Sequence, residues 1–117
     1  PILFIVEDNN LSILTEKKIR RNWNMHEVAK SFKMKGYNIS DDPKEILKYQ
    51  KYFFKEPMLL NINTNRLFWH SGAGIDSDKI FDRYKSLSRL FGDKSIEYDL
   101  KIKNFIEKKW KKIYEQL

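Results

Sequence analysis

The chain has 117 residues, of which 41% are hydrophobic and 15% aromatic, enough for one small domain and too many for a disordered chain. It has no cysteine, which excludes a disulfide scaffold and a thiolate metal site and fits an intracellular, cytoplasmic setting. The net charge of +7 suits an anionic partner, although the lysines near the C-terminus are more simply explained as the solvated face of a helix.

Targeting signals are the next feature. No stretch approaches the ~20 apolar residues of a membrane span, so we expect no membrane partner. The N-terminal apolar run lacks the basic region that precedes the core of a signal peptide. The sequence starts at Pro1, directly before a strand-like run, so we expect a removed initiator Met or the C-terminal piece of a longer protein.

The first segment carries the strongest local pattern. An apolar run over residues 2–6 ends on two acids and then on the amides Asn9 and Asn10. This pattern predicts a strand, buried on both faces, whose carboxyl end opens into a polar crevice. Ligands of open α/β sheets bind at that end of the strands. Residues 11–23 are basic, and we expect them to be irregular.

Two pairs of helix and strand are predicted next. Asn24, with an acid three residues later, resembles a capping box and begins a helix to about residue 33. Residues 37–39 form a short strand. The cap, proline and acid at 42–45 begin a second helix, and residues 58–63 form a third strand. The second helix should bury an apolar stripe: Ile46, Tyr49 and Phe53, with Leu47 at its edge.

The last third is predicted to be a loop and two helices. Residues 65–76 contain glycines beside tryptophan, histidine and arginine, which is typical of a functional loop. Asp76 or Ser77 should begin a helix through about Phe91, which Gly92 ends. A final helix from about Ile96 has an i, i+3, i+4 apolar stripe. Its members are Ile102, Phe105, Ile106, Trp110, Ile113, Tyr114 and Leu117.

The order of these elements predicts the fold. Alternating strands and helices indicate an α/β domain, with a partial parallel sheet of about three strands, right-handed crossover helices and two C-terminal helices. Three strands make a thin sheet, and a parallel sheet needs both faces covered. We therefore expect the chain to continue a sheet begun elsewhere or to pair closely with a partner.

Two groups of polar residues are candidates for binding. The side chain of Asn9 or Asn10 and a nearby backbone carbonyl could provide two oxygen ligands for Mg²⁺, although such amides often only hydrogen-bond the following turn. The donors Arg66, His70 and Ser71 suit a phosphate, although loop histidines are more often structural. Adjacent His70 and Ser71 do not place a hydroxyl against an imidazole as acyl transfer requires.

The strands resemble those of a receiver domain of bacterial response regulators. Residues 5–9 resemble its first strand and acidic pair, and residues 57–62 resemble its phospho-acceptor strand. The acceptor must be an aspartate, however, and Asn61 cannot form an acyl phosphate. The separation of Asp8 from Asn61 is also longer than we expect for that family, and residues 69–76 have no counterpart there. A degenerate, receiver-like module is therefore an alternative.

The chain also resembles the alpha subunit of thiamine-diphosphate-dependent 2-oxo acid dehydrogenases. Their cofactor motif starts with Gly-Asp-Gly and closes with Asn-Asn after an apolar strand, which residues 1–15 resemble. Residues 27–39 resemble the helix and strand that follow. Residues 64–71 resemble the Thr-Tyr-Arg…His-Ser loop that closes over the diphosphate. The similarity covers nearly the whole chain, and the two motifs occur in the family's order.

Three departures from that pattern are visible. Ser12 replaces the usual aromatic residue, which is harmless if only its carbonyl binds metal. Residues 72–76 replace the usual acidic loop, which would fit a variant substrate class. Gly-Asp-Gly is absent from the chain. Its aspartate is a metal ligand in the family, so the resemblance implies that the chain would hold half of a cofactor site.

The resemblance implies that residues 1–117 are the C-terminal half of a thiamine-diphosphate-binding domain, inactive alone. Asn10 would give Mg²⁺ its side-chain oxygen and Ser12 its backbone carbonyl, while His70 would donate to the diphosphate. Asn9 would shape the turn and Arg66 would brace the loop. The implied cofactors are thiamine diphosphate and Mg²⁺, and the implied cofactor-binding residues are Asn9, Asn10, Ser12, Arg66, His70 and Ser71.

The resemblance also implies partners. One is an upstream half that carries Gly-Asp-Gly, and the other is a pyrimidine-domain, beta-type subunit. In the family that subunit provides the glutamate that activates the aminopyrimidine ring, so no catalytic residue is assigned here. The alternative is a non-enzymatic module that is receiver-like or binds nucleic acid through aromatics among lysines. Helical spacing places Trp110 on the apolar stripe, which favours a core position over contact with bases.

Overall fold

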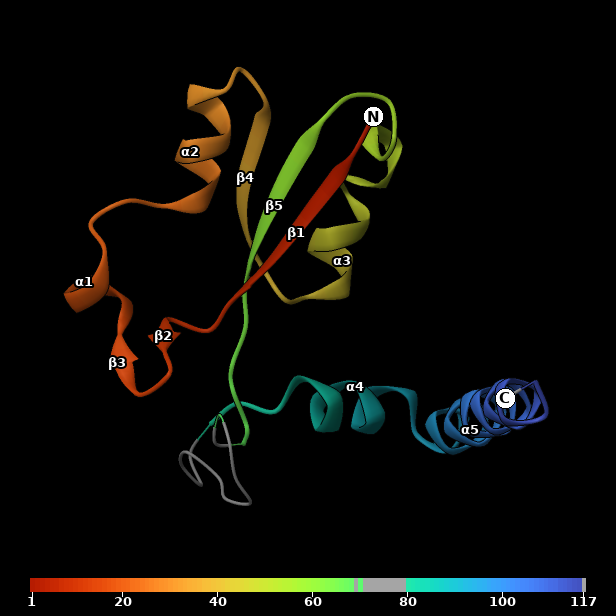
Figure 1. Ribbon diagram of the computed structural model, residues 1–117. Coiled ribbons are helices and arrows are strands. Elements are labelled where there is room, and N and C mark those ends of the chain that lie inside the picture. The colour runs from red at the N-terminus through yellow and green to blue at the C-terminus, as the bar shows by residue number, and fades with distance from the viewer. Residues whose placement is uncertain (69, 71–79, 117) are drawn as a thin grey trace. The chain divides into compact units, whose positions relative to one another are not determined.

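The computed structural model describes residues 1–68, 70 and 80–116, and the chain divides into two compact units (Figure 1). The first unit, Pro1–Phe81, holds a three-stranded parallel sheet with helices between its strands. The second, Asp82–Leu117, holds two helices. The α/β fold predicted from the sequence is therefore confirmed.

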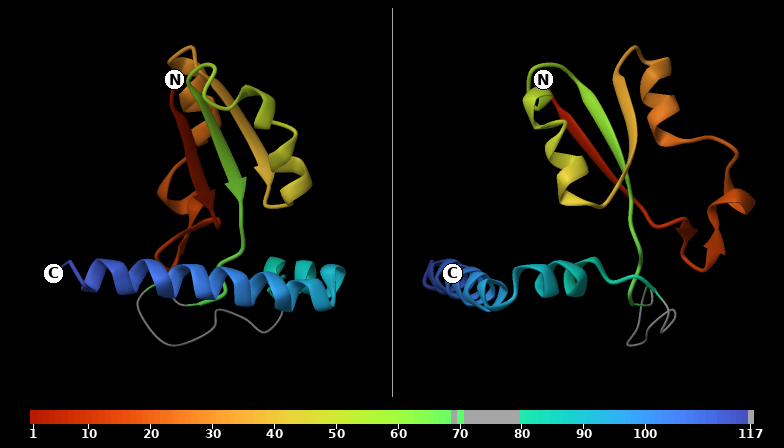
Figure 2. Two further views of the ribbon diagram at one scale, coloured as in Figure 1. Left: turned by 90° about the vertical axis from the view of Figure 1, so that its right-hand side faces the viewer. Right: turned by 180° about the vertical axis from the view of Figure 1, so that it is seen from behind.

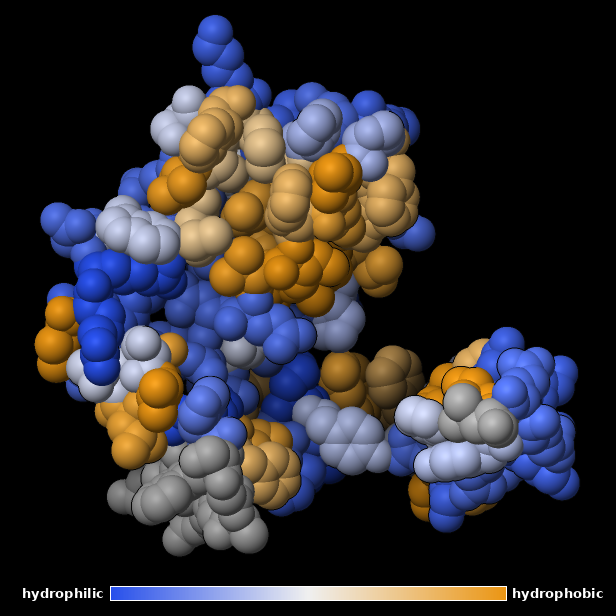
Figure 3. Space-filling view, in the orientation of Figure 1, coloured by the Kyte–Doolittle hydropathy of each residue, from blue (hydrophilic) through white to orange (hydrophobic). Residues whose placement is uncertain are grey.

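The sheet has the strand order β1-β5-β4, with all neighbours parallel. Its strands are β1 (Leu3–Asp8), β4 (Lys35–Ser40) and β5 (Met58–Asn63), close to the three predicted segments. The third strand along the chain lies in the centre, and every residue of β5 except its last is buried. Figure 3 shows the apolar surface gathered over the sheet, with hydrophilic residues toward its carboxyl end.

The prediction that the first strand is buried on both faces is wrong. Among the described strands, β1 has a neighbour on one side only and so lies at the edge of the sheet, and Phe4 and Ile5 are 43% and 57% exposed. A continuous apolar run predicts burial on both faces, but that environment belongs to β5. The sequence could not show which strand is central, because that depends on β5 inserting between β1 and β4.

Helices α2 (Met25–Ser31) and α3 (Pro43–Leu47) lie on opposite faces of the sheet (Figures 1 and 2). α3 begins as predicted, because the Asp42 side chain accepts the Lys44 amide and proline holds the first position. It is shorter than expected and continues as a 3₁₀ turn, η1 (Gln50–Tyr52).

The main core lies between α3, η1 and the sheet. Alternate residues of β5 and Ile39 of β4 form its buried centre, as the period of two in a strand requires. The predicted stripe of Ile46, Tyr49 and Phe53 packs against that centre, and Leu47 is exposed as expected at its edge. The buried centre is Ile39, Met58, Leu60 and Ile62.

On the opposite face, α2 packs close to β4 at a glycine. A Cβ atom at Gly36 would lie 2.1 Å from the carbonyl oxygen of His26, so only glycine allows this approach. α2 ends at Ser31, two residues before the predicted end, because Lys33 has a φ of 59°. The amide of Met34 then bonds the carbonyl of Ala29 at 3.0 Å, which closes the helix as a Schellman motif.

The segment predicted to be irregular is ordered. β2 (Leu11–Ser12) and β3 (Thr15–Glu16) form an antiparallel hairpin, and α1 (Lys17–Arg20) follows directly. The two-residue turn lacks the usual glycine or asparagine, and Ile13 adopts a φ of 61°. That missing turn signal is why the sequence did not indicate a hairpin.

The second unit consists of α4 (Arg83–Phe91) and α5 (Asp93–Tyr114), separated by Gly92 with a φ of 55°. The predicted helix end at Gly92 is confirmed. A helix that starts at Asp76 or Ser77 would include residues 80–82, but these are not helical, so that part of the prediction is wrong. Residues 76–79 lie outside the described residues. The Asp82 side chain caps α4 by accepting the Lys85 amide. α5 begins three residues earlier than expected.

No residue of α4 or of α5 is buried. The predicted apolar stripe lies on α5 as far as Tyr114, and its last member, Leu117, lies outside the described residues. Trp110 is 54% exposed, so the expectation of a core position is wrong. Within the described part of the chain, none of the helices is long and apolar enough to cross a membrane.

Candidate functional site

Polar side chains from all three strands meet near the carboxyl end of the sheet. The parallel register and the alternation of side chains place Asp8, Asn38 and Asn61 on the face that also carries Gly36. The Asn61 amide nitrogen donates to the Asn38 side-chain oxygen at 2.8 Å and lies 3.4 Å from Asp8 Oδ2. Asn61 is 2% exposed, and among the described residues its own side-chain oxygen has no hydrogen-bond partner.

Asp8 is the electrostatic centre of this group. Lys17 Nζ and Arg21 Nη2 lie 2.6 and 3.2 Å from its Oδ2, and the Asn10 amide donates to its Oδ1 at 3.0 Å. Burial acts to raise the pKa of Asp8, but the bonds from Lys17, Asn10 and Asn61 outweigh it and hold the pKa below its ordinary value. Asp8 therefore stays ionised and orients two cations.

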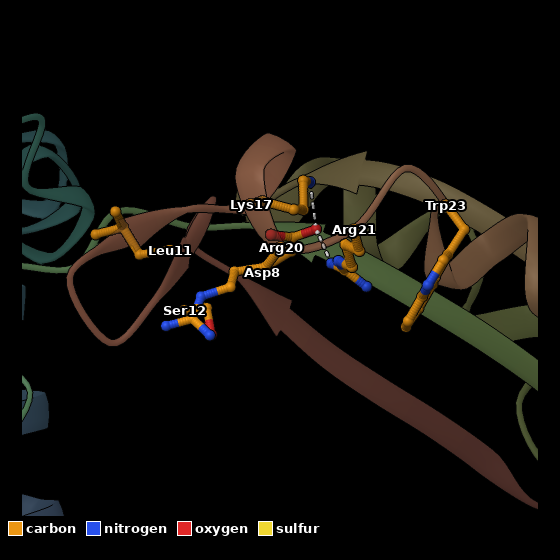
Figure 4. A pocket seen from close by; sticks show the side chains of 7 residues that line it. All are labelled: Asp8, Leu11, Ser12, Lys17, Arg20, Arg21 and Trp23. Carbon is orange, nitrogen blue, oxygen red and sulfur yellow. Dashed lines mark hydrogen bonds and ion pairs between the residues drawn. The ribbon is translucent and has the colours of Figure 1, made fainter.

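A hollow of about 330 Å³ opens beside Asp8. Figure 4 shows the side chains of Lys17 and Arg21 directed to the carboxylate, with the Trp23 ring beyond Arg21. The Arg21 guanidinium lies 4.6 Å from the centre of that ring. The lining comes from the end of β1, the hairpin, α1 and the residues after it, and consists of Asp8, Leu11, Ser12, Lys17, Arg20, Arg21 and Trp23.

The charge of the lining favours an anion. Three cationic side chains and one carboxylate line the hollow, so the lining has an excess of two positive charges when Asp8 is ionised. Arg20 is exposed and has no ionic partner among the residues that the structure describes. A guanidinium with free donors beside a second guanidinium and an ammonium is an arrangement that recognises phosphate oxygens.

The predicted amides take different positions. The side-chain oxygen of Asn9 accepts the Leu11 amide at 3.0 Å and so holds the turn after β1. Asn10 has a φ of 61°, and its carbonyl accepts the Lys17 amide at 2.9 Å. Neither amide lines the hollow, whereas Ser12 does.

The other predicted group follows β5. Arg66 Nη1 lies 2.5 Å from the Ile13 carbonyl oxygen, and the Thr64 amide donates to the Asp8 carbonyl at 3.0 Å. The segment after β5 thus lies against the segment after β1, which brings together two parts of the chain that carry the predicted motifs. His70 is exposed and does not line the hollow, and Ser71 lies outside the described residues.

The chemistry around Asp8 does not favour a cation. In the described ranges, no three histidine, aspartate or glutamate side chains gather as a metal site would require. The Asp8 carboxylate already accepts from an ammonium and a guanidinium. A divalent ion at this carboxylate would have to displace or repel both of them.

Sequence reasoning missed the cationic side chains as site residues. Lys17, Arg20, Arg21 and Trp23 all lie in the segment 11–23, which was expected to be irregular. The available signal was a basic cluster a few residues after a strand that ends on acids. The pairing of Asp8 with Asn61 had no local signal, because 53 residues separate them.

Comparison with known proteins leaves the site to be interpreted from its geometry. No family model, no curated protein and no solved structure matches this chain.

Proposed function

We propose that the first unit binds a phosphate-bearing small molecule in the hollow beside Asp8. The observation that carries this proposal is the convergence of Lys17, Arg20 and Arg21 on one hollow at the carboxyl end of a parallel sheet. Ligands of such sheets bind at this end. The Asp8 carboxylate holds Lys17 and Arg21 in place. Arg20 forms no ion pair within the described part of the chain, so its guanidinium can bind the ligand.

A calorimetric titration of the full chain with inorganic pyrophosphate tests the proposal. Arg20→Gln should weaken binding by about 10- to 100-fold, since a hydrogen bond to a charged group contributes about 1.5–3 kcal/mol. Arg89→Gln on α4 removes the same charge from an exposed residue outside the hollow and should leave binding unchanged. Absence of pyrophosphate binding, or equal losses in the two variants, would reject the proposal.

A second candidate is a more specific form of the first. The chain would be half of a thiamine-diphosphate site in a 2-oxo acid dehydrogenase alpha-type subunit. The contact of Arg66 with the Ile13 carbonyl favours this candidate, because it joins the two segments that resemble the family's cofactor motif. The basic lining fits a diphosphate, whereas the pairing of Asp8 with cations does not fit Mg²⁺ at that carboxylate.

In this second candidate the cofactor would provide the carbanion chemistry, and the chain would hold its diphosphate. Asn10 and Ser12 would be the metal ligands of the completed site, with an upstream half and a beta-type subunit as partners. Thiamine diphosphate should then bind the isolated chain weakly, with Mg²⁺ adding little. Tight, Mg²⁺-dependent binding would contradict the half-site. Equal affinities for pyrophosphate and thiamine diphosphate would support the general proposal and give the specific one no support.

A further inference from the structure

The second half of α5 carries an exposed apolar stripe. Ile102, Ile106, Trp110 and Ile113 are 58%, 47%, 54% and 46% exposed. At 3.6 residues per turn, these four positions fall within about 80° of the helix circumference. Their spacing therefore builds one continuous apolar face about three turns long.

Aromatic rings and lysines border this stripe. The helical period places Phe105 on one side of it and Tyr114 on the other, and the rings of Trp110 and Tyr114 lie 6.0 Å apart. Lys109 lies next to the stripe on the Phe105 side, with its ammonium 5.5 Å from that ring. Lys103 lies on the opposite side.

The part of α5 that carries the stripe is strongly positive. Between residues 101 and 112 the helix has six lysines and one acid, Glu107. All residues in this range are exposed. α4 reaches α5 before the stripe begins, where the Tyr84 hydroxyl hydrogen-bonds Asp99. The stripe and its lysines thus form a basic amphipathic surface on an ordered helix.

We propose that this surface, residues 102–114 of α5 with their flanking lysines, binds an anionic phospholipid bilayer. The isoleucines would enter the boundary between headgroups and acyl chains, and the lysines would contact the lipid phosphates. Aromatic rings at the border of an apolar stripe are typical of the membrane interface. A nucleic-acid surface would not require three isoleucines along its centre. The proposal departs from two sequence expectations, that this face is merely solvated and that the chain has no membrane partner. It does not rest on the hollow of the first unit.

Cosedimentation of the full chain with vesicles tests this proposal. The chain should bind equal mixtures of phosphatidylcholine and phosphatidylserine, bind pure phosphatidylcholine far more weakly, and lose affinity as salt increases. Replacing Lys103 and Lys109, which flank the stripe, with glutamine should weaken binding by about 25-fold, given a contribution near 5-fold from each lysine. Ile106→Gln should weaken binding without a change of charge.

The matched control removes two exposed lysines from the first unit: Lys44 and Lys55, each changed to glutamine. That variant has the same net charge as the α5 variant and should bind vesicles like the wild type. Circular dichroism should show the same helix content in all variants. Equal binding to both vesicle types, equal losses in the two lysine variants, or binding to duplex DNA without binding to vesicles would overturn the proposal.

Discussion

The two units of the chain differ in how far they bury their apolar side chains. In the first unit, Met58 and Leu60 are 0% exposed, because a central strand has neighbours on both sides and helices on both faces. In the second unit, α5 carries a stripe of large apolar residues and has no buried residue. Two helices alone cannot enclose an apolar stripe, so the same residue types build a core in one unit and a surface in the other.

The largest expected effect is on the core of the first unit. Leu60→Ala should lower the free energy of unfolding by about 3 kcal/mol, because it removes a fully buried side chain from the central strand. Urea denaturation of the full chain, followed by circular dichroism, measures this change. A loss below about 1 kcal/mol would mean that the centre of the sheet is far less packed than its burial indicates.

The next effect concerns the polar end of the same sheet. Asp8→Asn should lower the free energy of unfolding at neutral pH by about 1–3 kcal/mol, because Lys17 and Arg21 lose their anionic partner. The folded pKa of Asp8 is lowered, so its contribution is present above the unfolded pKa and disappears as the pH falls through the folded pKa. The stabilities of wild type and variant should therefore converge in acid. A difference that does not depend on pH would contradict this account.

The smallest effect is expected in the second unit. Ile106→Ala should change the free energy of unfolding by less than about 0.5 kcal/mol, because the side chain is 47% exposed. The loss of unfolding free energy can be compared directly with that of Leu60→Ala, since both variants remove a large aliphatic side chain. The same denaturation experiment measures it. A loss near that of Leu60→Ala would show that the stripe of α5 is covered in solution.

Much of the fold could be predicted because its signals are local. The strands were bounded by polar residues and glycine, and Asp42 with Pro43 marked a helix start. The hairpin was missed because Ile13 occupies a position that usually requires glycine, and the end of α2 because Lys33 does the same. The edge position of β1 depends on strand order, which no local pattern encodes.

The candidate site divides in the same way. The polar end of the first strand could be located from the sequence, but the partners of Asp8 could not. Asn61 reaches it through the sheet register, and Arg21 reaches it only after the chain has turned through the hairpin and α1. The roles that the resemblance implies for Asn10 and His70 remain predictions.

The outer side of β1 makes the sheet extensible. No described strand pairs with that side, so its outward amides and carbonyls can accept another extended segment. Phe4 and Ile5 point to opposite faces there, so an added strand would gain apolar contacts above and below its backbone. An added strand would make β1 an interior strand, and its apolar run would then lie in the buried environment that such a composition favours.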